Sequence, residues 1–304
     1  MQLQLFRTLW GHGDDIHRSA AEAAAAGFSG LEGGLPGAPN ARRDLAQALA
    51  DSGLDIIGEI CTGGEGDEWW IPRREASVKD HLATLEQGLQ NWDESGFAPR
   101  FINCMAGLDA WTLSQSVEFF GAAMALGAQF GRTLSFETHR SRAFYAPWTT
   151  LAVVRELPEI KITADFSHWC VVAERLIDTE EEALEVVTPR VHHIQARVGY
   201  PQGPQVPHPA APEYRECLEA HQRWWERIWQ SQVMRGYQVS TMTPEFGPNG
   251  YLQTLPFTGR PVADLWSLNL WMGQTERAHF ESAIGAPATP FANTSRSLES
   301  SLHP

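Results

Sequence analysis

The feature that most constrains the fold is a recurring pattern of short apolar runs that end in a chemically active residue. Eight such runs occur, and the segments between them have the composition of helices. The runs are FRTLWGH, SGLEGG, IIGEIC, RFINCM, LSFETHR, KITADFSHW, VHHIQAR and VSTMTPEFG. Strands that end in polar residues and alternate with helices are the pattern of a (β/α)8 barrel, whose sites form at the C-terminal ends of the strands. We therefore expect these residues to converge at one mouth.

The length of the chain and its lack of a linker-like segment favour a single-domain α/β protein of the (β/α)8, or TIM-barrel, class. A chain of 304 residues suits one barrel, and no linker-like segment precedes residue 285. A doubly wound open sheet is the alternative, but Gly11 and Gly13 after the first predicted strand do not form the phosphate-binding pattern GxGxxG. We predict the barrel over residues 1–285. The composition after that point, rich in Ala, Pro, Ser and Thr, predicts a flexible C-terminal tail over residues 286–304.

A proline-rich segment interrupts the pattern after the seventh predicted strand. Residues 199–214 (GYPQGPQVPHPAAPEY) contain five prolines and two glycines. A structureless linker is one interpretation of this composition. Long loops inside compact domains are often functional, however, so we expect an ordered lid over the barrel mouth.

The charge balance and the cysteine pattern exclude several classes of protein. The net charge is −14, with 23 basic and 37 acidic residues and no Lys/Arg-rich block, which argues against a nucleic-acid partner. The N-terminus lacks the pattern of a signal peptide, and no apolar run reaches the ~20 residues of a membrane span. Four dispersed cysteines without a CxxC motif suit a reducing compartment. We therefore predict a cytoplasmic protein without a membrane partner.

Carboxylates dominate the last strand ends and predict a metal centre. Glu137, Asp165 and Glu245 end the fifth, sixth and eighth predicted strands. On the seventh strand, side-chain alternation places His193 on the more polar face, which makes it the expected fourth ligand. Carboxylate oxygens bind hard divalent cations, and one imidazole shifts the preference away from Ca. We predict one divalent metal ion per chain: Mn, Co, Mg or Zn.

Other polar or aromatic side chains at the strand ends are candidates for substrate contact. Alone, each has an ordinary structural explanation, such as a helix cap or a hydrogen-bonded core residue. His168 lies one turn beyond Asp165, where it can reach a substrate. The remaining candidates at strand ends are Trp10, Glu59, Asn103 and His139.

The succession SFETH, TADFSHW, HHIQAR and TPEFGP resembles the xylose isomerase-like barrels, the sugar phosphate isomerase/epimerase superfamily. The resemblance covers residues 1–285 in layout, and its specific motifs lie between residues 133 and 248. It implies that Glu137 and Glu245 bind the metal and flank the sugar carbons as the catalytic pair. Asp165 and His193 would complete the coordination.

The same resemblance implies that His168 holds a substrate oxygen and that Arg197 contacts the substrate. One position departs from the pattern. Many relatives have HxH on the seventh strand and bind the metal through the second histidine, where this chain has Gln195. Either His193 takes the role, or the amide oxygen of Gln195 is the ligand.

These parts predict a divalent-metal-dependent sugar isomerase or epimerase that moves a proton next to a carbonyl through an enediolate. If the intermediate expels a β-substituent, the enzyme is instead a lyase or dehydratase acting on a keto-sugar or keto-glycoside. A non-catalytic sugar-binding barrel is a further alternative. Phosphodiester cleavage would need additional metal ligands and a basic groove, which the acidic balance opposes. The expected partner is a small-molecule carbohydrate, and the sequence leaves open whether the chain forms a homo-oligomer.

Overall fold

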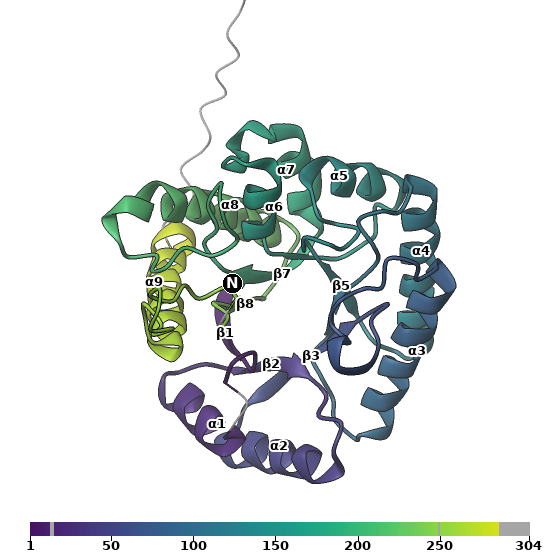
Figure 1. Ribbon diagram of the computed structural model, residues 1–304, viewed down its shortest axis with the longest axis horizontal. Helices are drawn as coiled ribbons and strands as arrows, with labels where there is room; N and C mark the ends of the chain where they lie inside the picture. Colours follow the sequence, from purple (N-terminus) through teal and green to yellow (C-terminus); the bar gives the residue numbers. More distant parts are fainter. Residues whose placement is uncertain (13–14, 249, 286–304) are drawn as a thin grey trace, which may run out of the picture.

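Eight parallel strands close into a barrel in the computed structural model, which describes residues 1–12, 15–248 and 250–285. Each strand pairs with its neighbours in the sequence, and β1 pairs with β8 to complete the ring (Figure 1). The strands are β1 (Gln2–Thr8), β2 (Gly30–Gly34), β3 (Asp55–Cys61), β4 (Ile102–Met105), β5 (Leu134–Glu137), β6 (Ile162–Ala164), β7 (Val191–Ala196) and β8 (Val239–Pro244). The predicted (β/α)8 barrel is confirmed, and the open doubly wound sheet is excluded. The predicted tail over 286–304 lies outside the described residues.

The helices form an outer ring around the strands (Figure 1). They are α1 (Ile16–Ala25), α2 (Pro39–Ser52), α3 (Val78–Glu94), α4 (Leu113–Gln129), α5 (Pro147–Glu156), α6 (Ser167–Ala173), α7 (Glu181–Val187), α8 (Arg215–Met234) and α9 (Leu265–Gly285). Side-chain caps set where several of them begin. Ser77 and Asp80 form a reciprocal capping box at α3, and the Asp15 side chain accepts a hydrogen bond from the Arg18 N–H at α1. Within the described part of the chain, no helix is both long and apolar enough to cross a bilayer.

Side chains fill the inside of the barrel in layers. Phe6, Ile57 and Phe101 form an apolar cluster of their own, each two residues before a more polar position of a strand. Gly30 leaves the space that Phe6 needs, because a Cβ at Gly30 would lie 2.4 Å from the Phe6 ring. Inward-facing side chains recur at every second residue of a strand. The next layer toward the mouth therefore comes from residues such as Glu59 and Asn103, and it is polar.

Helices α8 and α9 bury a carboxyl group that has no ionic partner among the described residues. Glu276 is fully buried, and its Oε1 accepts a hydrogen bond from Gln222 at 2.8 Å, while its Oε2 has no partner in the described ranges. Burial raises the pKa of Glu276 to about 8, with a further contribution from Glu226 and an opposing one from the Gln222 hydrogen bond. The folded protein therefore keeps this group protonated at neutral pH.

Wild-type protein should lose stability as the pH rises from about 4.5 to about 8. In this window Glu276 releases its proton in the unfolded chain but keeps it in the folded protein. The free energy of unfolding therefore falls by up to about 1.4 kcal/mol for each pH unit. Glu276→Gln should show a shallower dependence, because only the contribution of this one group is removed, and it should be more stable than wild type at pH 8. Urea unfolding at several pH values measures both slopes, with Glu281→Gln on the exposed side of α9 as the control. Equal slopes for wild type and Glu276→Gln would contradict the assignment.

Candidate active site

Three carboxylates from different strands meet at the C-terminal end of the barrel. Glu137 is the last residue of β5, Asp165 directly follows β6, and Glu245 directly follows β8. One oxygen atom from each can be chosen so that all three lie within 4.8 Å of one another. All three residues are buried, with Glu245 the most exposed at 8%. The structure thus brings together the acids that the sequence singled out.

The electrostatics of this group favour a bound cation. Burial raises the pKa of Glu137 and of Glu245 well above the usual range, and neighbouring carboxylates raise both further. Burial also raises the pKa of Asp165, against the opposing effect of Arg197. Buried carboxylates that face one another are costly to ionise, and a divalent cation among them would reverse this by stabilising the charged forms.

Arg197, which follows β7, is an internal counter-ion of the group. Its guanidinium donates hydrogen bonds to the Asp165 carboxylate, to Ser167 Oγ at 3.1 Å and to the Glu245 carbonyl at 3.2 Å. Its Nη1 also lies 3.6 Å from Glu245 Oε2. Burial alone would lower the pKa of Arg197, but Asp165 and Glu245 raise it above its ordinary value. The predicted substrate contact is therefore also bound to two of the acids.

Two histidines lie beside the acids and are neutral. Arg197 Nη2 lies 2.7 Å from His168 Nε2, and because a guanidinium only donates, Nε2 is the acceptor. The His168 proton is then on Nδ1, a buried atom without a partner in the described part of the chain. The His139 ring centroid lies 3.9 Å from that of His168, and both side chains form a second close group with Glu137. Burial lowers the pKa of each histidine well below its usual value.

The predicted contacts from β3 and β4 also reach this layer. Asn103 donates a hydrogen bond from Nδ2 to Glu137 Oε2 at 3.0 Å, and its Oδ1 is buried without a partner among the residues described. Burial raises the pKa of Glu59 well above the usual range, and the charges of Glu32 and Glu245 raise it further. Glu59 is therefore suited to donate a hydrogen bond as a neutral acid.

His193 is hydrogen-bonded to Thr241 and Glu32 and belongs to neither of the close groups that contain Glu137, in contrast to the expectation from the sequence. Its Nδ1 is 2.8 Å from Thr241 Oγ1 and its Nε2 is 3.1 Å from Glu32 Oε2, so both ring nitrogens have partners. The register between β7 and β8 explains the placement. His193 pairs with Thr241, four residues before Glu245, and therefore lies deeper in the barrel.

Gln195 is the β7 side chain that reaches the acids. It pairs with Thr243, two residues nearer the mouth than the His193 pair. Its Nε2 donates hydrogen bonds to Glu245 Oε1 at 3.1 Å and to Glu32 Oε1 at 3.4 Å. Its Oε1 is buried and has no partner in the described ranges. Of the two alternatives for the seventh strand, Gln195 is the one beside the acids.

Aromatic side chains form the rim above this layer. Trp10 is 37% exposed and packs edge-on against Tyr251, with ring centroids 4.8 Å apart. The guanidinium carbons of Arg197 and Arg140 lie 4.8 and 4.9 Å from the Tyr251 ring centroid. The predicted contact Trp10 is thus at the mouth, where its exposed face is available to a ligand.

No protein-family model and no curated protein matches the sequence. Solved structures do match its fold. The 3-keto-D-glucoside 4-epimerase of E. coli, in its apo form, has a TM-score of 0.52 and 13% identity, over 94% of this chain and 100% of that chain. A xylose isomerase-like TIM barrel protein of Mycobacterium smegmatis, in complex with magnesium, has a TM-score of 0.56 and 12% identity, over 88% of this chain and 89% of that chain.

The chain shares the (β/α)8 TIM-barrel fold of these structures. A third match is the probable 3-DHS dehydratase of Bacillus anthracis, with a TM-score of 0.50 and 16% identity over 83% of this chain and 95% of that chain. Proteins with this fold thus include an epimerase, a probable dehydratase and a metal-bound barrel. The resemblance inferred from the sequence motifs is confirmed at the level of the fold.

The sequence pattern did not predict a role for three residues of the site. Glu32 was recognised only as a strand end, although it contacts His193 and Gln195. Ser167 donates both its N–H and its hydroxyl to Asp165 Oδ1, as its position two residues after an Asp could have suggested. Tyr251 comes from the loop after β8, which carries no periodic signal that would place it over the mouth.

Residues 199–214 are attached to the β8 side of the mouth. Gln205 is buried, accepts a hydrogen bond from the Gly247 N–H at 2.8 Å and donates one to the Gly247 carbonyl at 3.3 Å. Gly247 lies two residues beyond Glu245, so the segment is fixed next to one acid of the site. That it acts as a lid over bound substrate stays a prediction.

Gln205→Ala should loosen this segment, because it removes both side-chain hydrogen bonds that hold it to Gly247. We expect faster limited proteolysis within residues 199–214 than in wild type, since cleavage follows local opening. Gln202→Ala, at an exposed position of the same segment, is the matched control. A bound sugar should slow wild-type cleavage if the segment closes over it. Cleavage that is insensitive to the sugar in wild type would argue against a lid.

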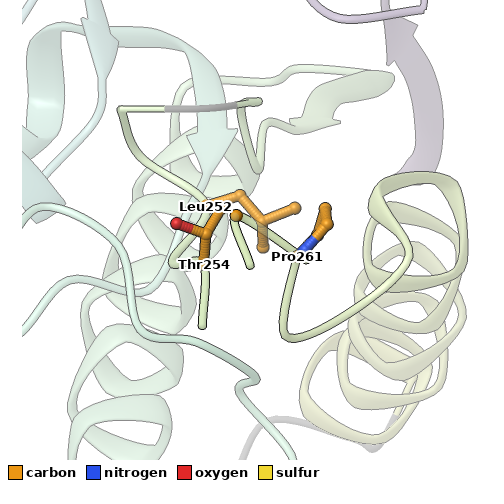
Figure 2. A pocket seen from close by; sticks show the side chains of 4 residues that line it. Leu252, Thr254 and Pro261 are labelled. Carbon is orange, nitrogen blue, oxygen red and sulfur yellow. The ribbon is translucent and has the colours of Figure 1, made fainter. Parts of the chain in front are cut away.

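A small cavity of about 230 Å³ lies away from the acids, within the loop between β8 and α9. Figure 2 shows three of its lining residues, Leu252, Thr254 and Pro261. None of the candidate site residues lines it. We therefore assign the chemistry to the polar layer at the strand ends and give this cavity no role in it.

Proposed function

We propose that the chain is a divalent-metal-dependent enzyme that isomerises or epimerises a sugar by moving a proton next to a carbonyl. The observation that carries this proposal is the convergence of Glu137, Asp165 and Glu245, three buried carboxylates with oxygens within 4.8 Å of one another. Such a group is typical of a cation site at the mouth of a TIM barrel. The substrate class is a small-molecule carbohydrate.

The donor set fits one divalent ion, Mn, Co, Mg or Zn. Glu137, Asp165 and Glu245 would hold it, and Glu245 Oε2 is a buried oxygen without a hydrogen-bond partner among the described residues. When bound, the ion polarises a carbonyl oxygen and lowers the cost of negative charge on it. The magnesium complex of the M. smegmatis barrel supports metal binding in this fold.

The proton transfer is assigned to Glu137 and Glu245. They come from β5 and β8, strands that are not neighbours in the barrel, so they approach a bound substrate from different sides. One carboxylate removes the carbon-bound proton, and the other returns a proton to the opposite face to complete an epimerisation. Isomerisation results when one base moves the proton between adjacent carbons. His168, Arg197 and Asn103 hold the substrate oxygens.

A lyase or dehydratase is the second candidate, because the same enediolate can expel a β-substituent instead of regaining a proton. The probable dehydratase with the same fold supports this alternative. The two reactions differ in their products. An isomerase or epimerase conserves the substrate mass, whereas a lyase releases water or another leaving group.

Metal analysis with a sugar screen tests the proposal. We expect one divalent ion per chain, loss of activity in chelator and recovery when Mn, Co, Mg or Zn is added back. A panel of keto- and aldo-sugars, followed by mass and NMR analysis of products, separates isomerisation from elimination. Full activity of chelator-treated, metal-free protein would contradict the metal. A barrel that binds sugars with no conversion of any of them would indicate a binding protein.

A further inference from the structure

We infer that the carbonyl oxygen of Gln195 is the strand-seven metal ligand and that Glu32, held by His193, positions its amide for this role. This inference rests on the proposed metal site and assigns its fourth donor. It also assigns a role to Glu32, a buried acid that lies outside the group formed by Glu137, Asp165 and Glu245.

The neighbours of Gln195 determine which end of its amide faces them. Both hydrogen-bond partners of the amide nitrogen are acids, Glu245 at 3.1 Å and Glu32 at 3.4 Å. A bound cation keeps these carboxylates ionised, and ionised carboxylates only accept hydrogen bonds, so in the metal-bound site the NH₂ group is the end between them. If the amide were reversed, its carbonyl oxygen would face the carboxylate oxygens of Glu245 and Glu32, with no hydrogen atom between them to form a bond. The two acids therefore leave the carbonyl oxygen as the free end.

That carbonyl oxygen lacks the partner that buried polar atoms normally have. Gln195 is 1% exposed, and Oε1 has no hydrogen-bond donor among residues 1–12, 15–248 and 250–285. Buried amide oxygens are nearly always satisfied, and each exception needs an explanation. The amide nitrogen contacts Glu245 Oε1, and the carbonyl oxygen is bonded to the same carbon atom as that nitrogen, so the free oxygen stays close to one carboxylate of the three-acid group. A cation there would satisfy the amide oxygen as well as the acids.

Glu32 is held at both of its oxygens. Its Oε1 accepts from Gln195, and its Oε2 lies 3.1 Å from His193 Nε2, whose other nitrogen is occupied by Thr241. Both Glu32 and His193 are fully buried. His193 therefore orients Glu32, and Glu32 orients Gln195. Removing either would release the amide without removing a metal ligand.

The assignment changes the expected selectivity for the metal. Glu137, Asp165, Glu245 and Gln195 together offer only oxygen donors. Oxygen donors suit hard cations such as Mg and Mn, whereas an imidazole would favour Zn or Co. The ratio of Mn affinity to Zn affinity should consequently be higher in the wild-type chain than in a variant with histidine at position 195.

Calorimetric titration of the metal-free full chain with Mn²⁺ and with Zn²⁺ tests this without any substrate. Gln195→Leu keeps the size of the side chain but removes the oxygen, and it should weaken Mn²⁺ binding at least tenfold. Glu32→Gln should weaken it by about 10–100-fold, as loss of an outer partner of a ligand typically does. Gln195→His should shift the ratio of affinities toward Zn²⁺, a change that a purely structural role would not produce. Gln47→Leu on the exposed face of α2 is the control.

Each outcome of the titration separates this inference from the proposed function. Wild-type affinity in folded Gln195→Leu, with metal still bound, would overturn the assignment of Gln195 and leave the three-acid metal site in place. Loss of affinity in His193→Gln but not in Gln195→Leu would make His193 the ligand. Wild-type protein that binds neither ion would overturn the metal site itself and this inference with it. Urea unfolding of every variant confirms that the titrated protein is folded.

Discussion

Glu245→Gln should turn over its substrate about 10²–10⁴-fold more slowly than wild type while keeping its fold, because general-base assistance typically contributes a factor of that size. The amide still offers an oxygen to the metal, so part of the metal affinity should remain. It also still offers an acceptor to Gln195, which donates to Glu245 Oε1. The measurement is the steady-state rate on the best sugar of the screen at saturating metal.

The control for this variant is Glu219→Gln, an exposed acid on α8, which should keep wild-type activity. Urea unfolding checks that Glu245→Gln is folded, and a titration checks that it is saturated with metal. A Glu245→Gln protein that turns over at the wild-type rate would remove Glu245 from the proton transfer.

Asp165→Asn should act mainly through metal binding and should also destabilise the fold. The substitution removes a charged ligand, so affinity for the divalent ion should fall at least about tenfold, or 1.4 kcal/mol. It also removes the nearer of the two carboxylates that face the buried Arg197 cation, and breaking a buried ion pair typically costs about 3–5 kcal/mol. Added metal should restore part of the activity.

Metal titration, activity against metal concentration and urea unfolding measure these effects. Asp178→Asn is the matched control, because Asp178 pairs with Arg223 at an exposed position and such pairs contribute little. Rescue of Asp165→Asn but not of Glu245→Gln by excess metal is the distinguishing result. The reverse pattern would exchange the roles of the two acids.

The fold and the three acids could be predicted because both depend on local patterns. Parallel strands that alternate with helices close into a barrel, and the closure alone brings all the C-terminal strand ends to one mouth. Glu137, Asp165 and Glu245 each end a strand, so their meeting follows from topology without any knowledge of side-chain contacts. The same reasoning placed Asn103 and His168 next to them.

The position of His193 could not be predicted because height in the barrel depends on the register between strands. Alternation correctly turned His193 and Gln195 to the same side, but the residues differ by roughly 6.6 Å along the strand. The pairing register between β6 and β7 shifts between Ile162 and Thr163, and no sequence pattern predicts this shift. Register therefore decided that Gln195, and not His193, lies beside the acids.

The pairing of Arg197 with Asp165 and the placement of Tyr251 were also beyond the sequence. Arg197 was expected to contact the substrate, and its hydrogen bonds to the acid depend on the relative positions of β6 and β7. Tyr251 belongs to the loop after β8, whose path is fixed by tertiary packing and not by periodicity. Loop residues such as this one carry specificity in barrels while the strands carry the common chemistry.

The most direct test of the central claim is solvent deuterium exchange at the carbon next to the sugar carbonyl. Metal-loaded wild type in D₂O should place deuterium at that carbon, chelated protein should not, and Glu245→Gln should do so about 10²–10⁴-fold more slowly. A wild-type enzyme that epimerises its substrate without any exchange, at early and late conversion alike, would contradict the two-base enediolate mechanism.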